Sequence, residues 1–196
     1  EHLEKQLCDL ISDRAGDYDL VVVTDFGHGM LTEAVTAVLA EKAPFLAVNA
    51  QSNSANLGYN LITKYNCADY VCIDAPEAQL AMRDRFSDIG ELIDVQLRHA
   101  IDCERIIVTH GENGCVAWSP ELGVHQVPAF TNQVVDTVGA GDAFLSVTAP
   151  IVAAGSSMDI AGFIGNAVGA LKVGIVGHRR SVEKVPTQKY ITTLLK

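Results

Sequence analysis

Short runs of β-branched and aliphatic residues recur along the chain, and each is followed by glycine, proline or polar residues. Apolar runs bounded in this way are typical of buried β-strands. The pattern predicts strands at residues 19–26, 45–50, 70–73 and 105–110, and a hairpin of 115–119 with 123–129. Apolar residues recurring every three or four positions predict helices at 2–13, 32–43, 76–84, 88–101, 139–154, 157–174 and 187–195.

The order of these elements predicts the fold class. Strands separated by helices favour right-handed crossovers, and hence an α/β protein with a mostly parallel sheet flanked by helices. No internal repeat, low-complexity tract or linker divides residues 1–196, so we expect them all to belong to one domain. Ligands of such sheets bind outside the carboxyl ends of the strands. Four polar loops follow predicted strands there: DFGHG, NAQSN, IDAPE and THGENG.

Composition narrows the class of protein. Of 196 residues, 48% are hydrophobic and 19% charged, which excludes a disordered chain. No apolar run reaches about 18 residues, and the charged first ten residues do not resemble a signal peptide. The chain begins at Glu1 rather than methionine, so we expect a processed or truncated start.

Charge and cysteine content restrict the partners and the compartment. A net charge of −10 without a basic stripe argues against nucleic acid and anionic membranes as partners. Nucleotides and sugar phosphates remain compatible, because helix N-termini bind phosphate without net positive charge. The five cysteines form no CxxC pair and mostly lie in apolar runs, which predicts reduced thiols and a cytoplasmic protein.

The segment DTVGAGDAF, residues 136–144, carries the strongest chemical signal. Gly139, Ala140 and Gly141 directly precede an apolar helix, so their amides can converge at the positive end of the helix dipole and hold an anion. Asp142 lies in the same turn, where a carboxylate can accept a proton. An anion hole beside a base is the arrangement that phosphoryl transfer needs. From the residues alone, the alternative stays open that Asp142 only caps its helix and that the glycines only make a turn.

DTVGAGDAF is similar to the signature of the ribokinase-like (PfkB) carbohydrate kinases. Further segments resemble bacterial D-glycero-β-D-manno-heptose 7-phosphate kinases, which are the kinase module of ADP-heptose synthesis. They are VNAQSNSAN (48–56), YNLITKY (59–65), ADYVCIDAPEAQLAMRD (68–84) and DYDLVVVTDFGHGML (17–31).

This resemblance implies a ribokinase-like three-layer sandwich without the N-terminal strands and lid that complete kinases of the family carry. It implies that Asp142 is the general base and that Gly139, Ala140 and Gly141 supply amides to the transferred phosphoryl group. Without the lid we expect an exposed apolar edge and face, and therefore self-association, for example as a homodimer.

Two ion sites follow from the resemblance. Asp74 and Glu77 occupy the positions of the family's N-x-x-E motif, which organises Mg²⁺ and its waters, with Asp in place of Asn. Ordinary acidic residues in a first helical turn are the alternative for this pair. Asp136 and Thr137 stand where many relatives bind a monovalent cation, so the resemblance adds a potassium site.

The resemblance also implies contacts to ATP. Asn49 follows the second predicted strand, where relatives place an Asn near the phosphates, and Thr109, Gly111 and Gly114 form a T-x-G-x-x-G turn that faces ATP. Asn166 matches an Asn beside the adenine pocket, although an Asn among Ala and Gly also suits helix packing.

The implied activity is transfer of the ATP γ-phosphate to a sugar hydroxyl, with heptose 7-phosphate as the acceptor. ATP and a phosphorylated sugar are then the partners, and Mg²⁺ and K⁺ join ATP as cofactors. The alternative is a nucleotide-binding or regulatory module without turnover, since the region that binds the sugar is not seen in this sequence.

Overall fold

The computed structural model describes residues 2–131, 133–177 and 179–196; Glu1, where we expected a truncated start, lies outside them. Within these residues, six strands form one sheet in chain order. The strands are β1 (Val21–Asp25), β2 (Leu46–Ala50), β3 (Tyr70–Asp74), β4 (Ile106–Thr109), β5 (Cys115–Ser119) and β6 (Gly123–Val127). Strands β1 to β4 are parallel, and the hairpin of β5 and β6 adds two antiparallel strands. The predicted, mostly parallel α/β fold is confirmed.

The helices begin and end within a few residues of the predicted ranges. They are α1 (His2–Arg14), α2 (Glu33–Lys42), α3 (Ala75–Met82), α4 (Ile89–Leu92), α5 (Arg98–Ala100), α6 (Ala140–Ala153), α7 (Met158–Lys172) and α8 (Lys184–Leu194). The predicted helix 88–101 is interrupted, since a π-helical turn, η3 (Ile93–Leu97), lies between α4 and α5. Short 3₁₀ turns are η1 (Ala15–Asp17), η2 (Ile62–Lys64) and η4 (Gly111–Asn113).

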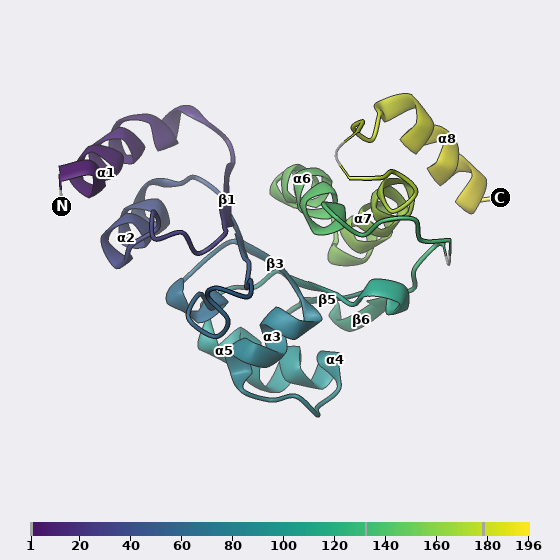
Figure 1. Cartoon of the computed structure of the whole chain (residues 1–196), viewed down its shortest axis with the longest axis horizontal. Helices are drawn as coiled ribbons and strands as arrows, with labels where there is room; N and C mark the ends of the chain where they lie inside the picture. The colour runs from purple at the N-terminus through teal and green to yellow at the C-terminus, as the bar shows by residue number, and fades with distance from the viewer. Residues whose placement is uncertain (1, 132, 178) are drawn as a thin grey trace.

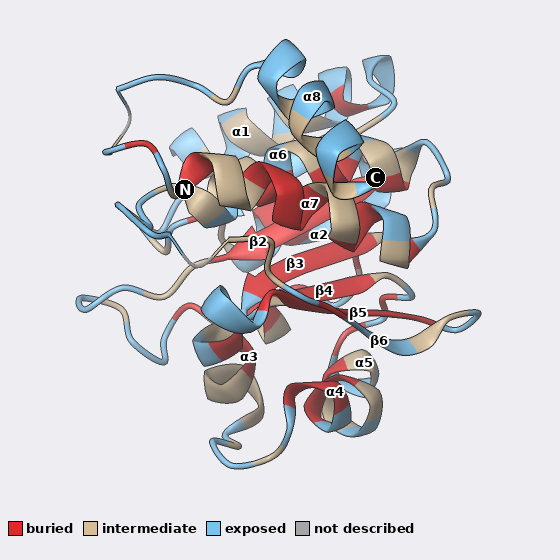
Figure 2. Cartoon of the chain, turned by 90° about the vertical axis from the view of Figure 1, so that its right-hand side faces the viewer, coloured by how far each residue is buried: buried red, intermediate tan, exposed pale blue. Residues whose placement is uncertain are grey.

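The sheet is the middle of three layers, because alternate side chains of its inner strands point to opposite faces. Val71 and Ile73 of β3 pack with α2, α3 and α4, whereas Tyr70 and Cys72 pack with α6 and α7. Figure 1 shows α6 and α7 on one side of the strands and α3, α4 and α5 on the other. In Figure 2 the strands form a buried band between the two helical layers. This arrangement is the predicted three-layer sandwich.

Strand β1 differs from the inner strands because one of its faces lacks a helical cover among the described residues. Val23 is buried against α2, but Val22 on the other face is 42% exposed. β1 is also an edge strand of the sheet. The exposed apolar edge and face expected from the sequence therefore lie at β1.

All five cysteines are free in the structure, and Cys72, Cys103 and Cys115 are buried. Burial raises the pKa of Cys72 to about 12, which keeps that thiol protonated. No described helix has the length and apolar character to cross a membrane.

A buried polar cluster holds the carboxyl end of β1 and the long connection from β2 to β3. Asp25 is 4% exposed and accepts hydrogen bonds from Gly27 N at 3.0 Å and Tyr65 Oη at 2.9 Å, and it pairs with Lys64. Burial alone would raise the pKa of Asp25, but the hydrogen bonds from Lys64, Gly27 and Tyr65 outweigh it and lower that pKa. The connection needs such polar contacts because it carries no α-helix, only η2.

The packing of α7 on α6 yields a matched pair of substitutions. A Cβ at Gly165 would lie 2.5 Å from the buried ring of Phe144, whereas a Cβ at Gly169, one turn later, would meet nothing within 4 Å. We expect Gly165→Ala to lower the free energy of unfolding by about 1–3 kcal/mol through overpacking. Gly169→Ala should raise it by about 0.5–1 kcal/mol, because alanine favours the helix. Urea unfolding of both variants measures the two changes in the free energy of unfolding. Equal changes in the two variants would contradict the packing of α6 on α7.

Candidate active site

The carboxyl ends of β2, β3 and β4 meet the first turn of α6 around a cavity of about 230 Å³. The sheet therefore brings together residues that lie far apart in the sequence, at the edge where parallel α/β sheets bind ligands. Its lining includes Asn49, Gln51, Ser52, Asp74, Glu77, Thr109, Gly139, Gly141 and Asp142.

Helix α6 begins at this cavity because Gly139 adopts a left-handed conformation, with φ of +75°, that turns the chain into the helix. The amides of Gly139 and Gly141 have no hydrogen-bond partner among the described residues. The amide of Ala140 differs from the expectation, since it donates to Thr137 O at 3.1 Å and closes the turn. The anion hole predicted from three amides thus keeps two available donors, at the positive end of the α6 dipole.

Asp142 lies in the first turn of α6, and its carboxylate is held from the sheet. Gln51 Nε2 donates to Asp142 Oδ1 at 3.0 Å. This contact favours a poised carboxylate over a simple helix cap. Gln51 was not predicted as a site residue, and the only signal for it in the sequence was a polar residue directly after a buried strand.

The backbone of Gln51 is fixed in turn by the polar cluster around β1. Its amide donates to Asp25 O at 2.8 Å, and its carbonyl accepts from Asn60 Nδ2 at 3.1 Å. Asn60 is 5% exposed and also accepts from Lys64 Nζ at 2.7 Å. The buried charges below β1 therefore support the residue that holds Asp142.

Asp74 and Glu77 form a capping box at the start of α3. Asp74 Oδ1 accepts from Glu77 N at 2.8 Å, and Glu77 Oε2 accepts from Asp74 N at 3.0 Å. Glu77 Oε1 also accepts from Ser52 N at 3.0 Å. Burial raises the pKa of both carboxyls, that of Glu77 to about 7. The capping alternative is thus present in the structure, but it leaves two acids at the cavity, Asp74 exposed and Glu77 partly buried.

Two buried polar atoms beside these acids lack partners among the described residues, namely Asn49 Oδ1 and Ser52 Oγ. Asn49 Nδ2 donates to Cys72 O at 2.8 Å, which fixes the side chain and leaves its oxygen unsatisfied. An unsatisfied buried oxygen is costly unless a ligand or water bonds to it. Within the described residues no group of three or more His, Cys, Asp or Glu could hold a metal ion alone. A hydrated Mg²⁺ fits this donor set, because it needs only one or two carboxylates plus waters and phosphates.

An apolar cavity of about 210 Å³ continues from the α6 turn toward the β5–β6 hairpin. Gly114, with φ of +84°, allows the turn after β4, because a Cβ there would collide with the backbone at 127–129. Asn166 Nδ2 donates to Val127 O at 2.9 Å and Pro128 O at 3.0 Å, so this residue both packs the helix and borders the cavity. The lining includes Thr109, Gly111, Gly114, Phe130, Val134, Phe144, Asn166 and Val173. Flat aromatic and aliphatic walls of this kind suit a purine base.

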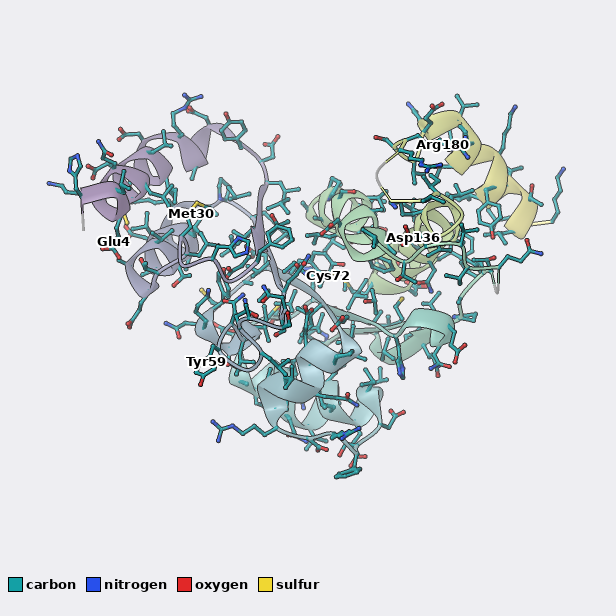
Figure 3. The ribbon with its side chains drawn as sticks, viewed as in Figure 1. Glu4, Met30, Tyr59, Cys72, Asp136 and Arg180 are labelled. Atoms are coloured by element: carbon teal, nitrogen blue, oxygen red, sulfur yellow. The ribbon has the colours of Figure 1, made fainter. Side chains whose placement is uncertain are left out.

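The segment expected to bind a monovalent cation is crosslinked within the chain. Asp136 Oδ2 accepts from Gly177 N at 2.7 Å, and Asp136 Oδ1 accepts from Val138 N at 3.0 Å. Lys172 Nζ donates to Val138 O at 2.6 Å and Gly177 O at 2.9 Å. Figure 3 shows Asp136 next to the layer of α6 and α7. Thr137 lines the apolar cavity.

A wider cavity of about 650 Å³ lies between α6, α7 and the segment that leads into α8. Asp142 and Gly139 border it together with three cationic residues, Lys172, Arg180 and Lys184. Asp142 thus stands between this cationic cavity and the cavity at the carboxyl ends of the strands.

A three-layer α/β sheet whose carboxyl edge faces a glycine-flanked helix N-terminus and a carboxylate is an arrangement that suits phosphoryl transfer. Residues 6–185 match the sequence pattern of the family described as "pfkB family carbohydrate kinase". The chain belongs to the pfkB family of carbohydrate kinases.

Curated relatives agree with this assignment. The chain is 27% identical over 176 residues to the bifunctional protein HldE of Citrifermentans bemidjiense, covering 89% of this chain and 36% of that protein. It is 30% identical over 179 residues to HldE of Nitrobacter hamburgensis, covering 89% and 36%. The chain therefore spans little more than a third of the length of these relatives.

The solved structures have the same fold. Escherichia coli phosphofructokinase-2 in complex with potassium gives a TM-score of 0.79 at 18% identity, covering 98% of this chain and 62% of that one. Ribokinase from Thermotoga maritima gives a TM-score of 0.72 at 19% identity, covering 96% of this chain and 60% of that one.

The raised pKa of Glu77 predicts how stability depends on pH. The folded carboxyl keeps its proton up to a pKa of about 7, while the unfolded one releases it near 4.5. Between these values the folded state binds more protons, so the free energy of unfolding falls as the pH rises. Relative to Glu77→Gln, the wild type should lose about 1–2 kcal/mol between about pH 5 and about pH 7.5, after discounting for partial exposure.

Urea unfolding across this pH range, without divalent cations, measures the difference. Glu33→Gln, in the first turn of α2, is the matched control and should follow the wild type. A difference between wild type and Glu77→Gln that stays constant with pH would contradict the partly buried, paired state of Glu77.

Proposed function

We propose that the chain is the ATP-binding and catalytic portion of a sugar kinase that transfers the ATP γ-phosphate to a hydroxyl of heptose 7-phosphate. The observation that carries this proposal is Asp142, which stands beside two unpartnered amides and between two cavities. Membership of a carbohydrate kinase family supports the reaction class, and resemblance to heptose 7-phosphate kinases supports the acceptor.

Each part of the site would have its own role in phosphoryl transfer. The purine base would lie in the apolar cavity, and Thr109, Gly111 and Asn49 would border the phosphates. The Gly139 and Gly141 amides would donate to the transferred phosphoryl oxygens, where the α6 dipole favours negative charge. Asp74 and Glu77 would hold Mg²⁺ through its waters, and the bound ion would neutralise charge that develops on the phosphates.

Asp142 would accept the proton of the attacking hydroxyl as the sugar oxygen forms its bond to the γ-phosphorus. The bond from that phosphorus to the β–γ bridging oxygen breaks, and ADP leaves with the electron pair. Because Gln51 holds Oδ1 of Asp142, the second carboxylate oxygen is available to the hydroxyl. A base held in one orientation is effective because proton transfer needs hydrogen-bond distance and alignment.

The wider cavity beside Asp142 supports a phosphorylated acceptor. Arg180 and Lys184 border it in a chain whose net charge is −10, and their positive charges would attract an anionic group of the acceptor. Figure 3 shows Arg180 on the outer side of this region, on the segment near α8.

Self-association is a further part of this proposal. The phosphofructokinase-2 of Escherichia coli has been solved as a tetramer, with a TM-score of 0.73 to this chain. Together with the exposed edge at β1, this supports self-association. A non-catalytic nucleotide-binding module is disfavoured, because such a module does not need a poised Asp142.

The test of the base is Asp142→Asn. We expect kcat for ADP release with Mg-ATP and heptose 7-phosphate to fall by about 10²–10⁴-fold, because the proton acceptor is lost. The Kd of ATP, measured by calorimetry, should change by less than about threefold. Asp159→Asn, in the first turn of α7, is the control and should retain full turnover. An Asp142→Asn variant that keeps most of its turnover would exclude Asp142 as the base.

The orientation of the base is tested by Gln51→Met, which keeps the length of the side chain but removes the donor. We expect kcat to fall by about tenfold or more while the KM for ATP stays within about twofold, since the contact is to the base alone. Gln126→Met, at an exposed position of β6, is the control for replacing glutamine by methionine and should keep the kcat of the wild type. If Gln51→Met raised KM instead of lowering kcat, Gln51 would be a nucleotide contact and not a positioning residue.

A further inference from the structure

Lys172, the last residue of α7, is buried in a place where lysine is rarely found. The residue is only 5% exposed, and its ammonium group donates to two backbone carbonyls, Val138 O at 2.6 Å and Gly177 O at 2.9 Å. Lysine is almost never buried to this degree unless its charge is satisfied or used.

The two carbonyls belong to two separate segments, one of which leads into the anion hole. Val138 directly precedes Gly139 at the start of α6, and Gly177 lies in the loop that follows α7. Asp136 ties the same two segments by accepting from Gly177 N. Lys172 therefore crosslinks the loop on which the first turn of α6 depends.

The adjoining residues Asp136 and Thr137 were expected to hold potassium. A bound alkali cation replaces its water shell with oxygens such as backbone carbonyls. Here two such oxygens already accept hydrogen bonds from Lys172, and the Asp136 carboxylate is engaged by Val138 N and Gly177 N. The donor set beside Asp136 and Thr137 therefore does not fit a potassium ion as well as it fits the ammonium group of Lys172.

We propose that Lys172 is a built-in cation that replaces potassium in this chain and holds the anion hole open without it. The inference deepens the proposed kinase function and rests on it for its catalytic consequence. Its structural part, a loop that stays ordered without potassium, stands on the contacts of Lys172 alone.

The geometry of one peptide bond explains how Lys172 acts on the site. The described chain contains no cis peptide, so the carbonyl of Val138 and the amide of Gly139 point in opposite directions. By binding Val138 O, Lys172 directs the Gly139 N–H away from itself, and this amide has no other partner among the described residues. Lys172 is thus a positioning residue for one of the two anion-hole donors.

Charge adds to this effect. Lys172 borders the same cavity as Gly139 and Asp142, so its positive charge lies near the place where phosphoryl charge would develop. Inside a protein such a charge is screened less than on the surface. A tethered cation also spares the cost of capturing a free ion, because it is present in every folded molecule.

The first experiment is a potassium titration of the wild-type chain, with choline chloride holding the ionic strength constant. Thermal unfolding, calorimetric binding of Mg-ATP and ADP release with heptose 7-phosphate are the three readouts. We expect potassium to leave Tm unchanged and to change the Kd of ATP and kcat by less than about 1.5-fold. A rise in Tm, or a several-fold gain in affinity or kcat with potassium, would overturn the proposal.

The second experiment uses Lys172→Ala, which leaves room for a free cation between the two carbonyls. Its Tm in choline should be lower than that of the wild type, and potassium should restore part of it. Its kcat should fall by about tenfold or more in choline and recover in part with potassium, while KM for ATP changes less. Lys189→Ala, an exposed lysine of α8, is the matched control and should respond to neither change.

These readouts separate the inference from the proposed function. If the wild type turns over no sugar, the kinase activity of this chain is refuted. The built-in cation is still supported if the Tm and the ATP affinity of the wild type do not change with potassium while those of Lys172→Ala do. A Lys172→Ala variant indifferent to potassium and as stable as the wild type would refute the built-in cation. If this variant does not fold, the potassium titration of the wild type still decides.

Discussion

The candidate site depends above all on where helix α6 begins. The left-handed conformation of Gly139 turns the chain so that the first amides of α6 face the carboxyl ends of β2, β3 and β4. A helix N-terminus favours anions, and the carboxyl edge of a parallel sheet is where polar side chains from separate strands converge. Their meeting brings Asn49, Asp74 and Asp142 around one cavity, although these residues are widely separated in the sequence.

The start of α6 is itself held by contacts that are polar rather than apolar. Lys172 and Asp136 join the loop before α6 to the loop after α7. On the sheet side, Gln51 reaches Asp142 and is fixed by Asn60 and by the carbonyl of Asp25. Buried polar networks of this kind specify one geometry, because leaving any member unpaired costs more than pairing it gains. Such precision suits a site in which the placement of a base and two amides decides function.

Local pattern was sufficient to predict most of the fold. Strands such as β3 read as uninterrupted apolar runs because both of their faces are buried, and the glycines of residues 136–144 marked the turn into α6. Asp142 was predicted from the same segment, because the anion hole and the base lie within one turn. The uncovered face of β1 also followed from the resemblance to longer kinases, and the exposure of Val22 agrees with it.

The contacts between distant segments could not be predicted. The hydrogen bond from Gln51 to Asp142 joins residues 91 positions apart, and no local pattern records it. Lys172 ends an apolar helix, and a basic residue in a last helical turn is ordinary because it favours the helix dipole, so its burial leaves no mark in the local pattern. The amide of Ala140 could not be separated from its neighbours, since only the folded turn shows that it donates to Thr137.

The central claim is that phosphate binds at the first turn of α6, beside Asp142. A crystal structure of the chain with Mg-ADP and aluminium fluoride, a mimic of the phosphoryl group in transfer, tests it most directly. The account predicts the fluoride within hydrogen-bond distance, about 2.7–3.2 Å, of the amides of Gly139 and Gly141, with the purine in the apolar cavity. A nucleotide bound elsewhere, or one whose phosphates point away from α6, would contradict the account.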